Sequence, residues 1–406
     1  MATGADEELH GVLIVGGGIC GLGTALALHI KGINRLLVLE KGESLRATGA
    51  GISIQANGWR ALDQLKVGDE LRKLAVPLTG MEKKSAIHGD KILEISYRSE
   101  CRCLKRSDLV ETLARSLPGG CIRFGCQVDA ISWDTTVTGR WPIVSTSNGS
   151  TIRANVVIGC DGSNSVVAKF LGLRSLRLLP MWAARGLTTI PEGHGFSNRF
   201  QQLVAEGVSF RLTPIDDKTL HFNAVHFRPP NPKEYTCSHH RVRDPMLIRQ
   251  LAMKAMPDDV AAVVRRCDTA SLSLAQLCYQ APWHMLLQPF QAGTVTVAGD
   301  AMHAMGPFIG QGGSCSLEDA VVLARCLAPT VAADDRKLDH KCVEKAISLY
   351  VQQRRGRILR LSMQSFLNGQ LIAASSWLKK VLIKAAMVVF FGGNSHGHTD
   401  YDCGSL

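Results

Sequence analysis

One stretch decides the fold of this 406-residue chain: Val12-Leu13-Ile14-Val15-Gly16-Gly17-Gly18-Ile19-Cys20-Gly21-Leu22. Its apolar start predicts a buried strand, and the glycines predict a tight turn into a helix. Gly16 permits the turn, Gly18 lets the backbone approach a pyrophosphate, and Gly21 lets the helix pack closely on the strand. The free N–H groups at the helix start, with their partial positive charge, would face the phosphates.

The residues downstream strengthen this interpretation. Leu36-Leu37-Val38-Leu39 predicts a second strand, which ends in Glu40. A βαβ unit places the carboxylate that accepts the ribose hydroxyls at this point. The pattern alone is weak evidence, and a glycine-rich loop without special function is the alternative. With the two strands around it, we predict dinucleotide binding.

The composition is that of a globular protein, with 46% hydrophobic and 20% charged residues and a formal net charge of +11. Basic residues are scattered, and the densest group lies in one predicted helix and consists of Arg354, Arg355, Arg357 and Arg360. We interpret this group as a solvated face or as a positive field that attracts an anionic cofactor and acidic substrates. Binding to nucleic acid is not expected.

The cysteine pattern, the first residues and one late apolar segment indicate the compartment in which the protein works. Thirteen cysteines show no C-x-x-C spacing, and Asp6, Glu7 and Glu8 near the start do not fit a secretory or transit peptide. We therefore expect a cytoplasmic protein. Residues 381–391 are apolar but too few to span a bilayer, so we expect a helix packed on the body, with a weak membrane-surface contact as the alternative.

The pattern predicts an α/β chain in four parts. Residues 10–175 form the first part of a cofactor-binding domain, 176–285 an inserted antiparallel substrate domain, 286–340 the second cofactor-binding part, and 341–406 a helical region and tail. Alternation over residues 220–227 puts His221, Asn223 and Val225 on one side of a strand. We expect core packing for them, and the lining of a substrate pocket is the alternative.

Two further motifs lie downstream of the first. Gly159-Cys160-Asp161-Gly162-Ser163 directly follows a predicted strand, where Asp-Gly alone indicates a turn. Gly299-Asp300-Ala301-Met302-His303 leads into the glycine-rich run 306–313. A strand end there presents Asp300 to a polyol such as ribityl, and the next helix start can stabilise negative charge on a reduced flavin ring.

In order and spacing, the three motifs resemble those of the flavoprotein hydroxylases. These are single-component FAD-dependent aromatic monooxygenases related to para-hydroxybenzoate and salicylate hydroxylases. The amino-acid sequences of these motifs and of residues 399–403 are most similar to those of the plant salicylate-hydroxylase-like monooxygenases, which also resemble zeaxanthin epoxidase. The resemblance covers about residues 11–370. It implies a Rossmann-like FAD-binding domain with an inserted antiparallel-sheet substrate domain and C-terminal helices.

The resemblance also implies the chemistry. NADH or NADPH would reduce FAD, and O2 would give a flavin C4a-hydroperoxide that inserts one oxygen atom into an aromatic or other electron-rich small molecule, such as an isoprenoid. No side chain is predicted to be catalytic. The alternatives are a flavoprotein reductase without oxygen insertion and a non-catalytic relative of the Rab GDP-dissociation inhibitor type. A monomer and a homodimer are both compatible with the sequence.

By position, the resemblance assigns cofactor-binding roles to residues of all three motifs. The FAD pyrophosphate would be held by Gly16, Gly18 and Gly21, and the adenosine ribose by Glu40. Arg106 would contact the phosphate and ribityl region, Asp161 and Gly162 would contact both FAD and NAD(P)H, and Gly299 and Asp300 would bind the ribityl chain. The flavin ring would be lined by Pro307, Gly310, Gly312 and Gly313. An ordinary surface arginine is the alternative for Arg106.

The chain departs from the family pattern after the second motif, where Ala168 stands in place of the usual arginine and Lys169 is the adjacent candidate substitute. For His303 we expect a packing or hydrogen-bonding role. His396 and His398 lie in a polar tail without a third partner, so no metal site is predicted.

Overall fold

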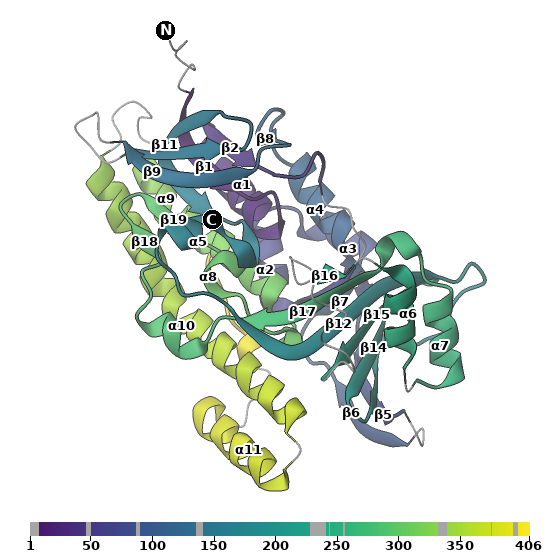
Figure 1. Ribbon diagram of the computed structural model, residues 1–406. Coiled ribbons are helices and arrows are strands. Elements are labelled where there is room, and N and C mark those ends of the chain that lie inside the picture. Colours follow the sequence, from purple (N-terminus) through teal and green to yellow (C-terminus); the bar gives the residue numbers. More distant parts are fainter. Residues whose placement is uncertain are drawn as a thin grey trace.

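A computed structural model describes residues 8–45, 50–86, 90–134, 141–227, 241–242, 244–254, 256–331, 339–374, 376–392 and 397–406. The chain forms two large sheets and a small one, with long helices along one side (Figure 1). The Rossmann-like α/β architecture expected from the first motif is confirmed.

The first sheet has the order β18-β19-β11-β1-β2-β8, and β10 and β9 continue from β11. Its central strands run parallel, and residues 12–15 of β1 are buried because helices α1, α9 and α10 share one apolar core with them. The strands are β1 (Glu8–Val15), β2 (Leu36–Leu39), β8 (Ile122–Arg123), β9 (Val128–Asp134), β10 (Trp141–Thr146), β11 (Thr151–Gly159), β18 (Gln291–Ala292) and β19 (Val295–Val297). The helices are α1 (Ile19–Ile30), α9 (Gly312–Val331) and α10 (His340–Ala373).

The second sheet has the order β16-β17-β12-β15-β14-β13-β5-β6. Helices α6 (Pro245–Met253) and α7 (Asp258–Arg265) cover one face, where Phe210 and Phe222 stack in the core. The strands are β5 (Gly80–Ser85), β6 (Lys91–Ser96), β12 (Arg177–Thr189), β13 (Arg199–Ala205), β14 (Val208–Pro214), β15 (Thr219–His226), β16 (Arg241–Val242) and β17 (Ser273–Tyr279). Because β5 and β6 come from within residues 10–175, this sheet draws on two separate parts of the chain; the domain boundaries stay predictions.

A small third sheet connects the two large ones. It consists of β3 (Gly51–Gln55), β7 (Cys101–Lys105) and β4 (Val76–Pro77), and β7 leads directly into α4 (Arg106–Arg115). Helices α2 (Ala56–Gln64) and α3 (Gly68–Leu74) are separated by Lys66, whose φ of 58° interrupts the helical path. Short helices α5 (Val166–Phe170) and α8 (Asp300–His303) follow the second and third motifs.

Residues 381–391 belong to helix α11 (Trp377–Phe391), which lies beyond the end of α10 and away from both large sheets (Figure 1). The expected helix is confirmed, and it packs on the body along α10. Of its side chains only Ile383 and Phe391 are buried, because α11 contacts the body mainly along α10. None of the helices in the described ranges combines the length and the hydropathy needed to cross a bilayer.

Candidate active site

The glycine loop after β1 is shaped by contacts at two glycines and left open at a third. Gly16 has a φ of 106°, and a Cβ atom there would lie 2.5 Å from the carbonyl oxygen of Cys160. A Cβ atom at Gly21 would collide with the carbonyl oxygen of Gly16. At Gly18 no atom lies within 4 Å of the Cβ position. The first two glycines therefore allow tight packing, and Gly18 borders free space at the start of α1.

This loop fits the pyrophosphate of FAD. Gly18 is the N-cap of α1 and brings no capping side chain, so backbone N–H groups at the helix start face the free space. Such N–H groups and the helix dipole favour a phosphate. The binding role of the three glycines stays a prediction that this geometry supports.

Glu40, the residue directly after β2, holds the same glycine loop in place. It is 7% exposed, its Oε2 accepts a hydrogen bond from the Gly17 N–H at 2.8 Å, and its Oε1 accepts one from Gly42 at 2.9 Å. The carboxylate thus fixes the glycine turn, a role that the sequence analysis missed. Its ribose-binding role stays a prediction.

The three motifs meet at the start of α1. Gly16 packs on Cys160 and Asp161 of the second motif, and a Cβ atom at Gly299 of the third would lie 2.8 Å from the Sγ of Cys20. Helix α8, which begins at Asp300, contacts the turn that begins at Gly162. Asp300 itself is exposed. Segments far apart in the sequence, such as those of Cys20 and Gly299, thereby surround one region.

Asp161 stabilises the turn of its own motif. Its Oδ1 accepts a hydrogen bond from the Ser165 hydroxyl at 2.5 Å, and its Oδ2 accepts one from the Val166 N–H at 2.6 Å. Burial raises the pKa of Asp161, and these hydrogen bonds oppose the rise. The turn interpretation of Asp-Gly therefore describes what the carboxylate does within the protein, and a contact with FAD or NAD(P)H stays a prediction.

Arg106 begins α4, and its N–H donates a hydrogen bond to the carbonyl of Ala50 at 3.0 Å, next to β3. From the end of β3, the Gln55 side chain donates to the carbonyl of Ile309 at 3.1 Å and accepts from Gln311. The loop expected to line the flavin ring is therefore held against β3.

Within this loop, residues 307–309 form a short 3-10 helix and Gly310 has a φ of 63°, which favours glycine. Gly313 packs on Ile52, whereas nothing lies within 4 Å of a Cβ atom at Gly312, the first residue of α9. Free space at this helix start fits the electron-rich edge of a flavin ring. The roles of Pro307, Gly310, Gly312 and Gly313 stay predictions.

A buried charge network holds the third motif in place. The Oδ2 of Asp319 accepts from the Gly299 N–H at 2.8 Å and lies 2.6 Å from the Nε2 of His303, while its Oδ1 accepts from the Nε of Arg354 at 2.6 Å. Arg354 also pairs with Glu318 at 2.8 Å, and Arg357 pairs with Glu318 at 2.7 Å. The expected hydrogen-bonding role of His303 is confirmed.

This network corrects the interpretation of the basic group on α10. Arg354 is fully buried and Arg357 is nearly so, and both are neutralised by carboxylates of α9. Arg355 donates to the carbonyl of Met285 and lies over the ring of Phe290. Only Arg360 of the four is exposed, so the group is not a solvated face.

The network also shifts the pKa values of His303 and Asp319. Burial acts to lower the pKa of His303, but Cys315 and the Asp319 carboxylate outweigh it and raise the pKa well above its ordinary value. Burial acts to raise the pKa of Asp319, but His303 and Arg354 lower it to about 2. His303, Cys315 and Asp319 lie close enough to share a metal ion. Both carboxylate oxygens already accept hydrogen bonds, so we assign no metal there.

The uncovered face of the second sheet carries a row of polar side chains. Arg185 on β12 and Arg211 on β14 are both register partners of Asn223 on β15, so the three lie side by side on one face. His221 lies on the same face, and a Cβ atom at Gly51 of β3 would be 2.7 Å from its Cβ. This face therefore turns toward β3, and His221 packs on it; the lining of a substrate pocket by His221 and Asn223 stays a prediction.

Among the described residues, two of these side chains leave a buried polar atom without a partner, and a third is a cation without a carboxylate beside it. The Nε2 of His221 and the Oδ1 of Asn223 are buried without a hydrogen-bond partner in the described part of the chain. Burial and the charges of Arg185 and Arg211 lower the pKa of His221 to about 3, so its ring is neutral at pH 7. Burial lowers the pKa of Arg211, which lies over the ring of Phe200 and pairs with no carboxylate of the described residues. The arrangement suits a ligand with negative charge.

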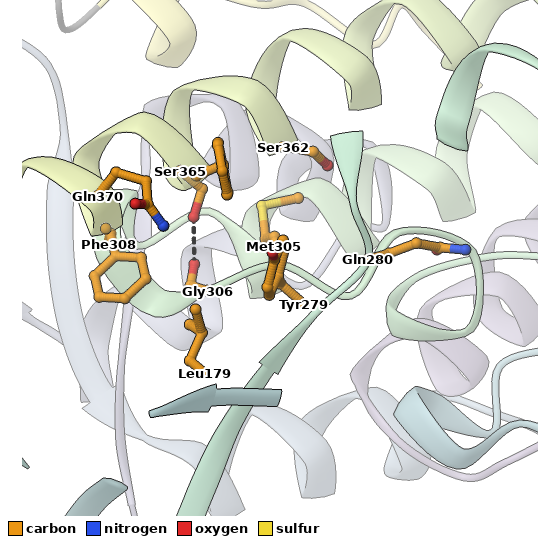
Figure 2. Close-up of a pocket in the computed structure, with 11 residues that line it drawn as sticks. Leu179, Tyr279, Gln280, Met305, Gly306, Phe308, Ser362, Ser365 and Gln370 are labelled. Carbon is orange, nitrogen blue, oxygen red and sulfur yellow. Dashed lines mark hydrogen bonds between the residues drawn. The ribbon is translucent and has the colours of Figure 1, made fainter. Parts of the chain in front are cut away.

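A cavity lies between the flavin-ring loop, the ends of β12 and β17, and α10 (Figure 2). The hydroxyl of Ser365 on α10 donates to the carbonyl of Gly306 at 2.7 Å, and the rings of Tyr279 and Phe366 stack in the wall. The wall is completed by Leu179, Gln280, Met305, Phe308, Ser362, Gly369 and Gln370. Helix α10 thus packs against the flavin-ring loop and forms one wall of this cavity.

Comparison with known proteins agrees with this geometry. The family described as FAD binding domain matches residues 10–346. The chain belongs to this family. Monooxygenase 1 of Arabidopsis thaliana is 43% identical over 98% of this chain and all of that protein, and Monooxygenase 2 of the same plant is 34% identical over 99% of both. The chain is an FAD-dependent monooxygenase, and the resemblance to the flavoprotein hydroxylases is confirmed.

Solved structures show the same fold at lower identity. HpxO of Klebsiella pneumoniae in complex with FAD and uric acid has a TM-score of 0.76 at 21% identity, covering 98% of this chain and 97% of that one. A salicylate hydroxylase substrate complex has a TM-score of 0.69 at 19% identity, covering 97% and 98%. The fold of the whole chain is therefore that of FAD-dependent hydroxylases.

Proposed function

We propose that this monooxygenase uses NADH or NADPH to hydroxylate a small aromatic acid, with the anionic group of the substrate bound by Arg211. The observation that carries the proposal is the half-buried Arg211, whose guanidinium lies over the ring of Phe200 and has no carboxylate partner in the described ranges. A buried cation is costly unless an anion or strong acceptors compensate it. The substrate supplies that anion, and Asn223 beside Arg211 hydrogen-bonds its polar substituent.

Each part of the chain has a defined task in this reaction. FAD, when bound, supplies the redox chemistry that inserts the oxygen atom. Gly18 and Asp300 hold the cofactor, the loop 306–313 positions its ring, and α10 with β12 and β17 excludes water from the reacting centre. His221 stays neutral at pH 7 and acts only as a hydrogen-bonding group.

Two similar solved structures support an acidic aromatic substrate. One is named as a salicylate hydroxylase substrate complex, and the other contains uric acid. Salicylate and uric acid are both small aromatic acids. Isoprenoids, which the sequence analysis left open, offer no group that compensates Arg211.

The test measures NADH and NADPH oxidation and O2 uptake by the purified flavoprotein with a panel of aromatic acids, each paired with its neutral methyl ester. We expect at least one acid to accelerate both rates and to give a product one oxygen atom heavier, while its ester has little effect. Acceleration by neutral isoprenoids alone, or by esters and acids alike, would contradict the proposal.

A further inference from the structure

The outward side of α11 is an uninterrupted apolar surface, which we call the α11 face. Six side chains of this face are 50–81% exposed, although they are large and hydrophobic. They are Trp377, Leu378, Val381, Leu382, Val388 and Val389. Their spacing places them on one side of the helix, opposite the buried Ile383. An apolar surface of this kind on a protein marks a site of association.

The charges of α11 have one sign. The helix contains Lys379, Lys380 and Lys384 and no acidic residue. At 3.6 residues per turn, Lys384 lies beyond one edge of the α11 face and Lys379 beyond the other, while Lys380 lies between the directions of Ile383 and Phe391. From a border position the four-carbon stem can lie along apolar surroundings while the ammonium group reaches outward to an anion.

We propose that the α11 face lies in the surface of a bilayer that contains anionic phospholipid, with the helix parallel to the membrane plane. A lipid surface offers hydrocarbon to the apolar side chains and phosphate or carboxylate groups to the lysines that flank them. Trp377 at the start of the helix suits the boundary between headgroups and acyl chains. This inference is independent of the proposed substrate.

The length of α11 agrees with lying on the membrane and not with crossing it. Fifteen residues extend about 22 Å as a helix, less than the roughly 30 Å of hydrocarbon in a bilayer. The helix is also anchored to the body, since Phe391 packs beneath the guanidinium of Arg360 on α10 and Lys379 hydrogen-bonds Gln370.

A second copy of this chain is a poorer occupant of the α11 face. A two-fold interface brings the same surface of each copy together, so the lysines of both helices would gather around one interface. Like charges placed together oppose association, and α11 has no carboxylate to offset them.

The test is flotation of the flavin-loaded full chain with vesicles of phosphatidylcholine and phosphatidylserine in a 70:30 ratio, compared with phosphatidylcholine alone. We expect binding to the mixed vesicles, and at least tenfold weaker partitioning for the double variant Leu382→Glu/Val389→Glu. Replacing the three lysines by glutamine weakens binding to the mixed vesicles by about fivefold for each lysine that contacts them. Leu74→Glu on α3, where an exposed leucine lies far from α11, is the matched control and binds as the unaltered chain does.

FAD content and the thermal midpoint, measured on every variant, separate loss of binding from loss of folding. The proposal is overturned if the unaltered chain does not float with mixed vesicles, or if the double variant floats equally well. It is also overturned if light scattering shows a dimer that the double variant abolishes while neither protein binds lipid, because the α11 face is then covered by a second copy.

Discussion

The cofactor-binding part of this monooxygenase takes its functional groups from short continuous stretches, whereas the substrate face of the second sheet takes them from three separate strands. Gly16, Gly18 and Gly21 lie within six residues and share one turn. Arg185, Arg211 and Asn223 become neighbours only through strand pairing. Cofactor binding is thus a property of local chain geometry, and substrate binding is a property of the register of a sheet.

The two regions also differ in how their charges are compensated. Around the third motif, each buried charge of Arg354, Asp319 and Glu318 has a partner in the protein. On the substrate face, Arg211 has no carboxylate partner in the described ranges. A compensated network stabilises the fold, and an uncompensated cation is available to a ligand. The following predictions test this difference, from the largest expected effect to the smallest.

Arg354→Met should cost the most stability. It leaves the Asp319 and Glu318 carboxylates buried beside an apolar side chain, so the free energy of unfolding falls by about 3–5 kcal/mol. Urea unfolding measures this loss. Arg360→Met, on the exposed side of the same helix, should change the value by less than about 1 kcal/mol. Equal losses in the two variants would show that the buried network does not stabilise the fold as described.

Asp300→Ala should remove most of the bound FAD without unfolding the protein. The carboxylate is exposed at the start of α8, and each lost hydrogen bond to the ribityl chain weakens binding by about 0.5–1.5 kcal/mol. Titration of the apoprotein with FAD, followed by flavin fluorescence, gives the change in Kd. A variant that keeps stoichiometric flavin would contradict the role assigned to Asp300.

Arg211→Met should separate the two regions most clearly. FAD binding is unchanged, while KM for an aromatic acid rises about thirtyfold, which corresponds to ~2 kcal/mol of lost charge pairing. Arg266→Met, which removes an exposed arginine of the same domain, is the control and leaves KM unchanged. If Arg211→Met instead lowers FAD affinity and leaves KM unaltered, the residue belongs to the cofactor site.

A pH series should detect the His303–Asp319 pair. The folded-state pKa of His303 lies well above 6.5, so the native protein keeps a proton that the unfolded chain releases above that pH. The stabilisation is complete below pH 6.5 and is lost as pH rises toward the folded pKa, at about 1.4 kcal/mol per pH unit. Between pH 7 and 8, the free energy of unfolding of the unaltered chain should therefore fall more steeply than that of His303→Gln. Parallel slopes would mean that His303 is neutral in the folded protein.

The sequence was sufficient for features that depend on adjacent residues. The turn at Gly16, the packing at Gly21 and the helix start at Gly18 follow from the spacing of the glycines, and the structure has all three. The family resemblance rests on such local motifs, which explains why it was recognisable over most of the chain.

Features that depend on distant partners could not be predicted. Arg354 looked like part of a basic surface because its partner Asp319 lies 35 residues away on another helix. Alternation put His221 and Asn223 on one side of a strand but did not say which face of the sheet α6 and α7 would cover. Residues 381–391 were expected to form a helix packed on the body, but the sequence could not show that this packing would bury only Ile383 and Phe391.

The most direct test of the account measures FAD per chain in Gly18→Val. Because the space at Gly18 is free of protein atoms and its φ is −88°, valine fits the folded protein and obstructs only a bound pyrophosphate. We predict one FAD per chain in the unaltered protein and in Gly119→Val, whose Cβ position is equally open but lies elsewhere, and almost none in folded Gly18→Val. A Gly18→Val protein that retains one FAD per chain would contradict the central claim that the cofactor binds at the meeting point of the three motifs.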